Sequence, residues 1–176
     1  FNLYGIDLRF KQKPSARNLG HGAVVWEASA IFAKYMEENC RKYSPTKLAG
    51  KTVFELGSGC GLGGLSFTMR GATVILSDLD CVVDTLTRDN AEAVYARTVS
   101  SNARPTYPVV MPIVTPLDWR TEYECPPEAP EPPYDIILLT DCVFSVDLAP
   151  DLVRTIQTLA GPKSEIYCCH EIRDEV

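Results

Sequence analysis

The sequence lacks the features of a membrane protein, a disulfide-rich protein or a zinc protein. No apolar run approaches the roughly 20 residues that a membrane-spanning helix needs. There are only two histidines, and the seven cysteines are odd in number and include no Cys-x-x-Cys pair. That pattern argues against a zinc site and a disulfide framework. We therefore expect reduced thiols, no metal, no membrane partner, and residence in the cytoplasm, with the nucleus as an alternative.

Positive charge is also scarce. The 17 Lys and Arg residues are outnumbered by 23 Asp and Glu residues, which gives a net charge of −6. A nucleic-acid-binding protein usually presents a basic face, so we expect no nucleic-acid partner. The acidic balance suits a partner that presents lysine or arginine. The sequence begins at Phe1 and shows no signal-peptide pattern, and we expect any targeting segment to lie outside it.

The sequence does contain an alternation of strand and helix patterns. Its length suits one domain with a single core, and we expect one domain over residues 1–176, in which 1–23 form an extension of strand and loop. Short apolar runs predict strands, and 3.6-residue periodicity predicts helices between them. The predicted strands are 51–56, 72–78, part of 107–119, 134–140 and 164–170, and the predicted helices are 25–40, 62–70, 81–97 and 148–161.

This alternation predicts an α/β fold with a Rossmann-like, doubly wound and mostly parallel sheet. A weak strand pattern at 3–10 is expected at the edge of the fold. Ligands of such sheets bind beyond the carboxyl ends of the strands, so motifs at those ends are the candidate site residues.

The first buried strand runs into the glycine-rich stretch FELGSGCGLGG. Glycine lets the backbone approach a ligand closely and turn sharply into a helix. A dinucleotide motif, G-x-G-x-x-G, is present, but so dense a glycine run matches many templates. The acidic-x-Gly-x-Gly-x-Gly pattern of S-adenosylmethionine sites matches 55–61 throughout. We expect Glu55 to meet the cofactor's amino group, directly or through water, and Gly57, Ser58 and Gly59 to line the cofactor site.

Ser58 is not expected to be a hydrolase nucleophile, because the G-x-S-x-G elbow would need glycine at positions 56 and 60. Asp78 ends the second strand, 21 residues after Gly57. A carboxylate at that place accepts hydrogen bonds from both ribose hydroxyls in either cofactor class, so it does not discriminate between them. Glu55 and the motif after the fourth strand favour the methyl donor.

Two candidate catalytic motifs flank that fourth strand. Glu131–Tyr134 is similar to the Asx-Pro-Pro-Tyr signature of enzymes that methylate nucleic-acid bases, and Asp141–Phe144 is similar to the Asp-x-x-aromatic signature of enzymes that methylate protein side chains. The first motif precedes the strand and therefore lies at its amino end. The second leaves the carboxyl end, where ligands bind. We therefore assign Asp141 and Phe144 to the candidate catalytic site.

Four stretches together resemble the seven-strand protein-lysine methyltransferases. They are GHGAVVWEASAIFAKYMEEN, VFELGSGCGLGGL, VILSDLD and LLTDCVF, and the resemblance extends from about residue 5 to 173. The most similar group methylates heat-shock chaperones, the valosin-containing ATPase and translation elongation factors, and the ending CCHEIR is similar to the valosin-containing-protein branch. In that family two further strands, usually a hairpin, complete the sheet, and we expect them to be missing from this chain.

The resemblance implies that the cofactor is S-adenosylmethionine, released as S-adenosylhomocysteine. It implies that the substrate is a lysine of a protein such as a chaperone, an ATPase or a translation factor, and we expect a monomer. The residues that would line the cofactor pocket are Trp26, Gly57, Gly59, Asp78, Trp119 and Thr140. Most of the nearest relatives carry tyrosine where this sequence has Phe144, so a role that needs a hydroxyl is in doubt there.

A lysine must lose its proton before it can attack a methyl group, which costs roughly 4.6 kcal/mol at pH 7. Asp141 can dock the amino group, but its charge favours the ammonium form. We therefore assign deprotonation to desolvation beside the sulfonium, with water or Asp141 taking the proton. Phe144 would form an aromatic wall for the lysine. Glu171 could help to select a basic substrate, and an exposed ion pair with Arg173 is the alternative.

Three other functions compete with this hypothesis. The chain could methylate a small molecule or a nucleic acid, although the acidic charge and the position of Glu131–Tyr134 weaken that alternative. A nicotinamide oxidoreductase would need a proton-donating Tyr-x-x-x-Lys or a catalytic histidine, and His21 and His170 are the only histidines. A scaffold that binds the cofactor without turnover is favoured by Phe144 and by the missing hairpin.

Overall fold

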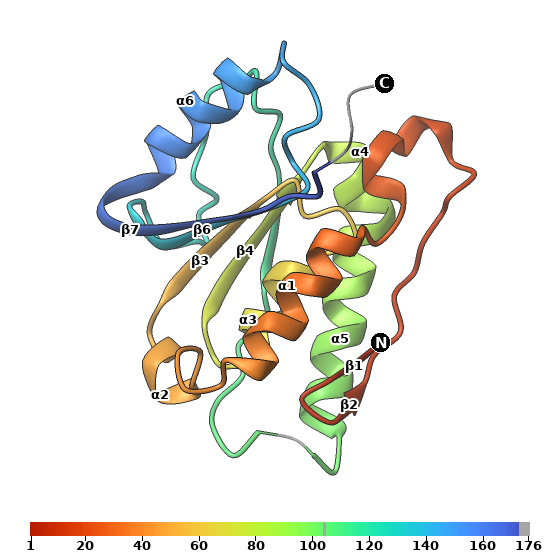
Figure 1. Cartoon of the computed structure of the whole chain (residues 1–176), viewed down its shortest axis with the longest axis vertical. Coiled ribbons are helices and arrows are strands. Elements are labelled where there is room, and N and C mark those ends of the chain that lie inside the picture. Colours follow the sequence, from red (N-terminus) through yellow and green to blue (C-terminus); the bar gives the residue numbers. More distant parts are fainter. Residues whose placement is uncertain (104, 173–176) are drawn as a thin grey trace.

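The centre of the molecule is a five-stranded parallel sheet, described by a computed structural model that covers residues 1–103 and 105–172 (Figure 1). Its neighbouring strands are parallel throughout. Their spatial order is β5 (Ile113–Pro116), β4 (Thr73–Asp78), β3 (Thr52–Leu56), β6 (Tyr134–Thr140) and β7 (Ala160–Cys169). The chain starts the sheet at β3, adds strands on one side and then crosses to β6 on the other. This reversal between β3 and β6 opens a crevice at the carboxyl ends of the strands.

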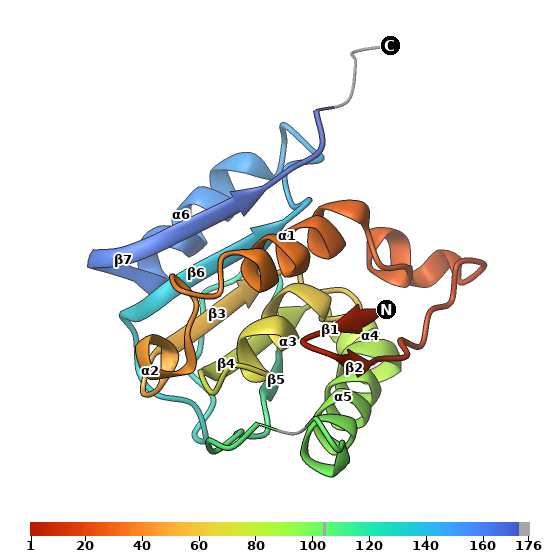
Figure 2. The same cartoon turned by 60° about the horizontal axis from the view of Figure 1, so that its bottom comes forward.

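Each face of the sheet packs against its own set of helices, because neither face of a parallel sheet is left in water. On one face, Val53, Leu76 and Leu138 lie in a core with Phe32 and Leu65. Figure 2 shows the helices that cover this face. They are α1 (Glu27–Glu38), α3 (Leu62–Thr68) and α5 (Arg88–Ser100).

The opposite face packs against α6 (Ala149–Leu159). Phe54, Ile75 and Leu139 alternate along their strands with the residues of the first core, and they contact Leu152 and Leu159 of α6. The doubly wound parallel sheet predicted from the alternating patterns is confirmed. The predicted bounds of β6 are reproduced to the residue, whereas β7 begins at Ala160, four residues before the predicted start.

The predicted helix over 81–97 is longer than expected and not uniform. It consists of α4 (Asp80–Val82), a π-helical turn η2 (Val83–Thr87) and α5. Short helices also occur in segments without a clear periodic pattern, η1 (Arg17–Ala23) and α2 (Pro45–Leu48). Among the described residues, no helix combines the length and the apolar character needed to cross a membrane.

The prediction of an edge strand at 3–10 is wrong. The chain instead forms a small antiparallel hairpin of β1 (Asn2–Leu3) and β2 (Ile6–Asp7), separate from the main sheet. Tyr4 and Gly5 connect the two strands with φ values of 51° and 75°, the left-handed backbone of a tight hairpin turn. The hairpin buries Leu3 and Ile6 in the core beside α1.

Candidate active site

A cavity of about 390 Å³ lies at the carboxyl edge of the sheet, at the crevice between β3 and β6. Its volume falls in the range of small-molecule sites. Segments far apart in the sequence form its wall: the residues before α1, the glycine loop after β3, the ends of β4 and β5, and the loop after β6. The predicted site residues that line it are Trp26, Gly57, Ser58, Gly59, Asp78, Trp119, Thr140, Asp141 and Phe144.

Glycine at position 57 lets two neighbouring side chains pack closely against the loop. Gly57 has a φ of 61°, and a Cβ atom there would lie 2.9 Å from Sγ of Cys142 and 3.1 Å from Cζ2 of Trp119. Strand β4 and the helical turn η2 hold the loop. The hydroxyl of Ser58 donates to the carbonyl of Ser77 at 2.8 Å, and the hydroxyl of Thr87 donates to the carbonyl of Gly59 at 2.7 Å.

Asp78 fixes the loop from the end of β4. Its Oδ2 accepts a hydrogen bond of 2.7 Å from the amide of Gly59, and its Oδ1 accepts one of 2.7 Å from the amide of Leu79. Burial raises the pKa of Asp78, and these two amides partly offset that effect. A carboxylate has lone pairs beyond those two bonds. Asp78 therefore orients the glycine loop and still offers acceptor capacity to the cavity.

Glu55 is not among the residues that line the cavity, and its contact with the cofactor's amino group, directly or through water, stays a prediction. Its side chain is completely buried beneath α3, where Oε2 accepts a hydrogen bond of 2.9 Å from the amide of Gly64. Burial is the main cause that raises the pKa of Glu55 to about 8, and the negative charge of Asp78 adds to it. The alternation of side chains along β3 points residue 55 toward the helix and away from the crevice.

The residues before α1 form one wall of the cavity. Of these residues, only Trp26 was predicted from the sequence to line it. Arg17 to Val25 contribute most of this wall. Leu19 and Ala23 anchor it by packing against the cluster that contains Cys60 and Leu86. The segment carried no periodic pattern, so its role was not visible in the sequence.

Asn90 of α5 ties this wall to the glycine loop. Its Oδ1 accepts from the amide of Lys11 at 2.7 Å, and its Nδ2 donates to the carbonyls of Lys11 and Cys60 at 3.1 and 3.2 Å. The side chain is buried, and these bonds satisfy both of its polar ends. One asparagine thus couples the position of the N-terminal wall to that of the loop beneath it.

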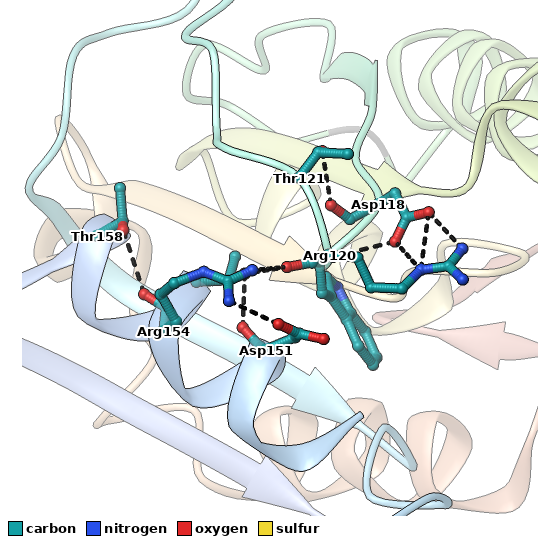
Figure 3. Close-up of polar contacts among 8 residues, drawn as sticks. Asp118, Arg120, Thr121, Asp151, Arg154 and Thr158 are labelled. Carbon is teal, nitrogen blue, oxygen red and sulfur yellow. Dashed lines mark hydrogen bonds and ion pairs between the residues drawn. The ribbon is translucent and has the colours of Figure 1, made fainter. Parts of the chain in front are cut away.

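Trp119 enters the cavity from the loop after β5, and α6 holds that loop in place. The guanidinium of Arg154 donates to the carbonyl of Trp119 at 2.7 Å and pairs with Asp151 at 2.6 Å. Figure 3 shows this arrangement beside the fork that Arg120 makes with Asp118. Trp119 lines the cavity, and its contact with the cofactor stays a prediction. The sequence did not reveal its support by Arg154.

Asp141 stands at the inner end of the loop after β6. Its φ of 62° is left-handed, and its amide donates to the carbonyl of Cys169 at 2.8 Å. Only 2% of its side chain is exposed, and Oδ1 lies 3.0 Å from Nδ1 of His170. The amide of Glu171 approaches the same oxygen at 3.4 Å. Glu171 thus contacts Asp141 through its backbone, while Arg173 lies outside the described residues.

Phe144 lies at the mouth of the cavity with two aromatic neighbours. Its ring centroid is 4.7 Å from that of His21 and 6.1 Å from that of Trp119. The ring is 42% exposed, so it can meet both the cavity and an arriving partner. Trp26 supports this edge, because its Nε1 donates to the carbonyl of His21 at 2.6 Å.

The motif at Glu131–Tyr134 is remote from this site, as predicted. Tyr134 begins β6, at the opposite end of the strand from Asp141, and its buried hydroxyl lies 2.6 Å from that of Tyr123. Within the part of the chain that the structure describes, no cluster of His, Cys, Asp and Glu side chains has the arrangement of a metal site.

Comparison with known proteins gives a consistent result. A family described as lysine methyltransferase matches residues 4–176. The chain is 32% identical to EEF1A lysine methyltransferase 3 of Xenopus tropicalis over 97% of its own length and 66% of that protein. It is 27% identical to protein N-lysine methyltransferase METTL21A of Danio rerio over 99% of its length and 71% of that protein. The chain thus spans about two thirds of the length of these curated relatives.

Solved structures share the fold. A putative S-adenosylmethionine-dependent methyltransferase of Methanococcus maripaludis has a TM-score of 0.58 at 14% identity, with 92% of this chain and 65% of that chain covered. A putative RNA methyltransferase of Pyrococcus horikoshii has a TM-score of 0.52 at 15% identity, with 88% and 65% covered. At this identity the likeness concerns the fold alone.

Proposed function

The chain belongs to the lysine methyltransferase family, and from that membership we propose that it transfers a methyl group from S-adenosylmethionine to the ε-amino group of a lysine in a protein substrate. The observation that carries the proposal is the position of Asp141. Its carboxylate lines the same cavity as the glycine loop, at the carboxyl edge of the sheet. A docked amine would therefore meet the cofactor at the place where parallel sheets bind ligands.

The cavity residues fit S-adenosylmethionine. Gly57, Gly59 and Gly61 place bare backbone at the cavity wall, where the cofactor's chain would lie. Asp78 would accept the ribose hydroxyls, and the indole of Trp119 would cover the adenine, with Trp26, Ser58, Gly59 and Thr140 completing the wall. When bound, the cofactor supplies an electrophilic methyl group on a positively charged sulfur. Glu55 would support this site from below, by holding the first turn of α3.

Asp141 would orient the substrate amine. A carboxylate oxygen in the cavity accepts a hydrogen bond from the ε-amino group and holds its nitrogen on a fixed line of approach. Positioning of this kind supplies up to about 7–11 kcal/mol of the barrier reduction in favourable cases. The left-handed backbone at Asp141 fits such a role, because strained conformations are concentrated at functional sites.

Phe144 would form the wall along which the lysine enters. Its exposed ring can contact the methylene stem and the cationic head, a contribution of about 0.5–2 kcal/mol. Tyrosine at this position would add a hydroxyl, but the ring alone provides this contact. His21 and Trp119 flank the ring.

The substrate class follows from the relatives and from charge. One relative is named for EEF1A, which makes a translation factor a candidate beside a chaperone or an ATPase. The net charge of −6 favours a basic partner over a nucleic acid. We further propose that the protein acts as a monomer in the cytoplasm or the nucleus. The seven cysteines carry no spacing typical of a disulfide framework, which supports the proposal of a reducing compartment.

The test is incubation of the protein with S-adenosylmethionine carrying a labelled methyl group and a cell extract, followed by mass spectrometry of the labelled material. We expect the label on lysine side chains. It should disappear with Asp141→Asn and persist with the control Asp84→Asn, whose carboxylate is largely exposed. Label in RNA, DNA or a small molecule with unlabelled protein would refute the proposal. Cofactor binding by calorimetry without any label would instead support a non-catalytic scaffold.

A further inference from the structure

Asp141 does not face the cavity alone, because a histidine is paired with its carboxylate. Nδ1 of His170 lies 3.0 Å from Oδ1, with 32% of the imidazole side chain exposed and 2% of the aspartate side chain exposed. His170 directly follows β7, and Asp141 directly follows β6. The two strands are paired up to Thr140 and Cys169, so the register of the sheet places these residues side by side. The pair thus has one side chain that is buried at the cavity, Asp141, and one that is in contact with solvent, His170.

The proposed methyl transfer needs a group that accepts the proton of the lysine, and this pair can provide it. A docked lysine arrives as an ammonium ion, and an isolated carboxylate stabilises that unreactive form. Only 2% of the aspartate side chain is exposed, against 32% of the His170 side chain, so the imidazole offers the larger contact with water for taking the proton away. An imidazole can accept and release protons near neutral pH, and this one contacts both the buried carboxylate and solvent.

Resting on the proposed function, we propose that His170 is a positioning residue that orients Asp141 and carries the substrate's proton away from it. An N–H bond of the lysine ammonium breaks, and its proton passes to Oδ1 of Asp141 and then to Nδ1 of His170. The exposed imidazolium releases a proton to water. The neutral amine then forms the N–CH₃ bond as the S–CH₃ bond breaks, and the bonding electrons remain on sulfur. Protons and charge balance without another reactant.

The groups around His170 are compatible with this role. The carboxylate of Asp141 faces it from the loop after β6, with Oδ1 3.0 Å from Nδ1. Cys169 precedes it on β7 and donates through Sγ to the carbonyl of Ala28 at 3.4 Å, at the start of α1, whose first turn carries Glu27. Burial raises the pKa of Cys169, so that thiol stays protonated and adds no charge. Glu171 follows in the chain and contacts the aspartate through its amide.

The test compares two variants in single-turnover methylation across pH 6–9. His170→Asn keeps a donor near Oδ1 but accepts no proton, and His170→Ala removes both properties. We expect both to lose about 100-fold in rate at pH 7.5, the lower end of general acid–base catalysis. Their rates should rise about tenfold per pH unit, whereas the wild-type rate should depend less steeply on pH. Added imidazole should restore part of the rate of His170→Ala. The control is Cys168→Ser, an exposed position on the same strand.

Three measurements distinguish a failure of the proton transfer from a failure of the proposed function. Cofactor affinity by calorimetry and the melting temperature should be unchanged in both variants, which shows that they fold. With only two histidines, NMR of the ring protons can follow the pair directly. Asp141→Asn should shift the signals of His170 in the protein without substrate. Full activity and a wild-type pH profile in His170→Asn would overturn the proton transfer, even where lysine is methylated. Wild-type protein that methylates no lysine would refute the proposed function instead.

Discussion

Replacing Glu55 with glutamine should make the protein less sensitive to pH. The pKa of the buried carboxyl is about 8, against an ordinary value of 4.5. Below pH 4.5 the group is protonated in both the folded and the unfolded chain. Above it, the unfolded chain releases the proton while the folded protein keeps it until about pH 8. The free energy of unfolding therefore falls as pH rises through this window, by about 1.4 kcal/mol per pH unit at most.

From pH 5 to pH 7 the loss due to Glu55 is about 2.5 kcal/mol, because its carboxyl is about three-quarters ionised in the unfolded chain at pH 5 and still protonated in the folded protein. Glutamine has a similar shape and does not titrate. Urea unfolding of both proteins at pH 5, 6 and 7 should show a difference in stability that grows by this amount in favour of Glu55→Gln. Other groups affect both proteins alike, so the difference isolates position 55.

A constant difference in stability across that range would refute the assignment of a protonated, buried carboxyl. The same variant tests the position of Glu55 relative to the cofactor. Because the side chain lies outside the cavity lining, Glu55→Gln should bind S-adenosylmethionine within about threefold of wild type, a difference of less than 1 kcal/mol. A loss of affinity of a hundredfold would instead support direct contact with the amino group.

Two further substitutions test the cavity. Gly57→Ala should weaken cofactor binding by at least about tenfold in calorimetry, since its Cβ would intrude on the indole of Trp119. Gly50→Ala, at a similar left-handed φ but with no atom within 4 Å of the added Cβ, should affect stability only, and equal losses of affinity in both would contradict the steric argument. Phe144→Ala should raise KM for the protein substrate by about 2- to 30-fold, and Phe144→Tyr should leave it near wild type. An unchanged KM in Phe144→Ala would exclude the aromatic wall.

The sheet was largely predictable because its central strands β3, β4 and β6 are buried on both faces and carry continuous apolar runs. The run at 134–140 has polar or proline-rich neighbours on both sides, and its bounds are correct. The hairpin at the N-terminus was not predictable from the same rule. There the strands are only two residues long, and the left-handed turn at Tyr4 and Gly5 decides the structure.

The site was predictable where a residue follows the end of a strand. Asp78, Asp141 and the glycine loop line the cavity for that reason. That Glu55 lies outside the cavity lining was not predictable, because alternation cannot be read from a strand that is buried on both sides. The N-terminal wall and His170 were missed for a different reason. Their positions depend on tertiary contacts, with Asn90 for the wall and with Asp141 for the histidine, which local patterns do not encode.

The left-handed backbone at Asp141 also bears on how this protein would lose its activity. Asparagine and glycine adopt that conformation more readily than most residues, so a single substitution to either should relax the loop and preserve the fold. Such a variant would keep the glycine loop and the aromatic side chains at the mouth of the cavity, but it would lack the carboxylate. It would make a stable trap for isolating the natural substrate. It would also pass any screen based on folding or cofactor binding, so an inactive descendant of this enzyme would look intact until turnover is measured.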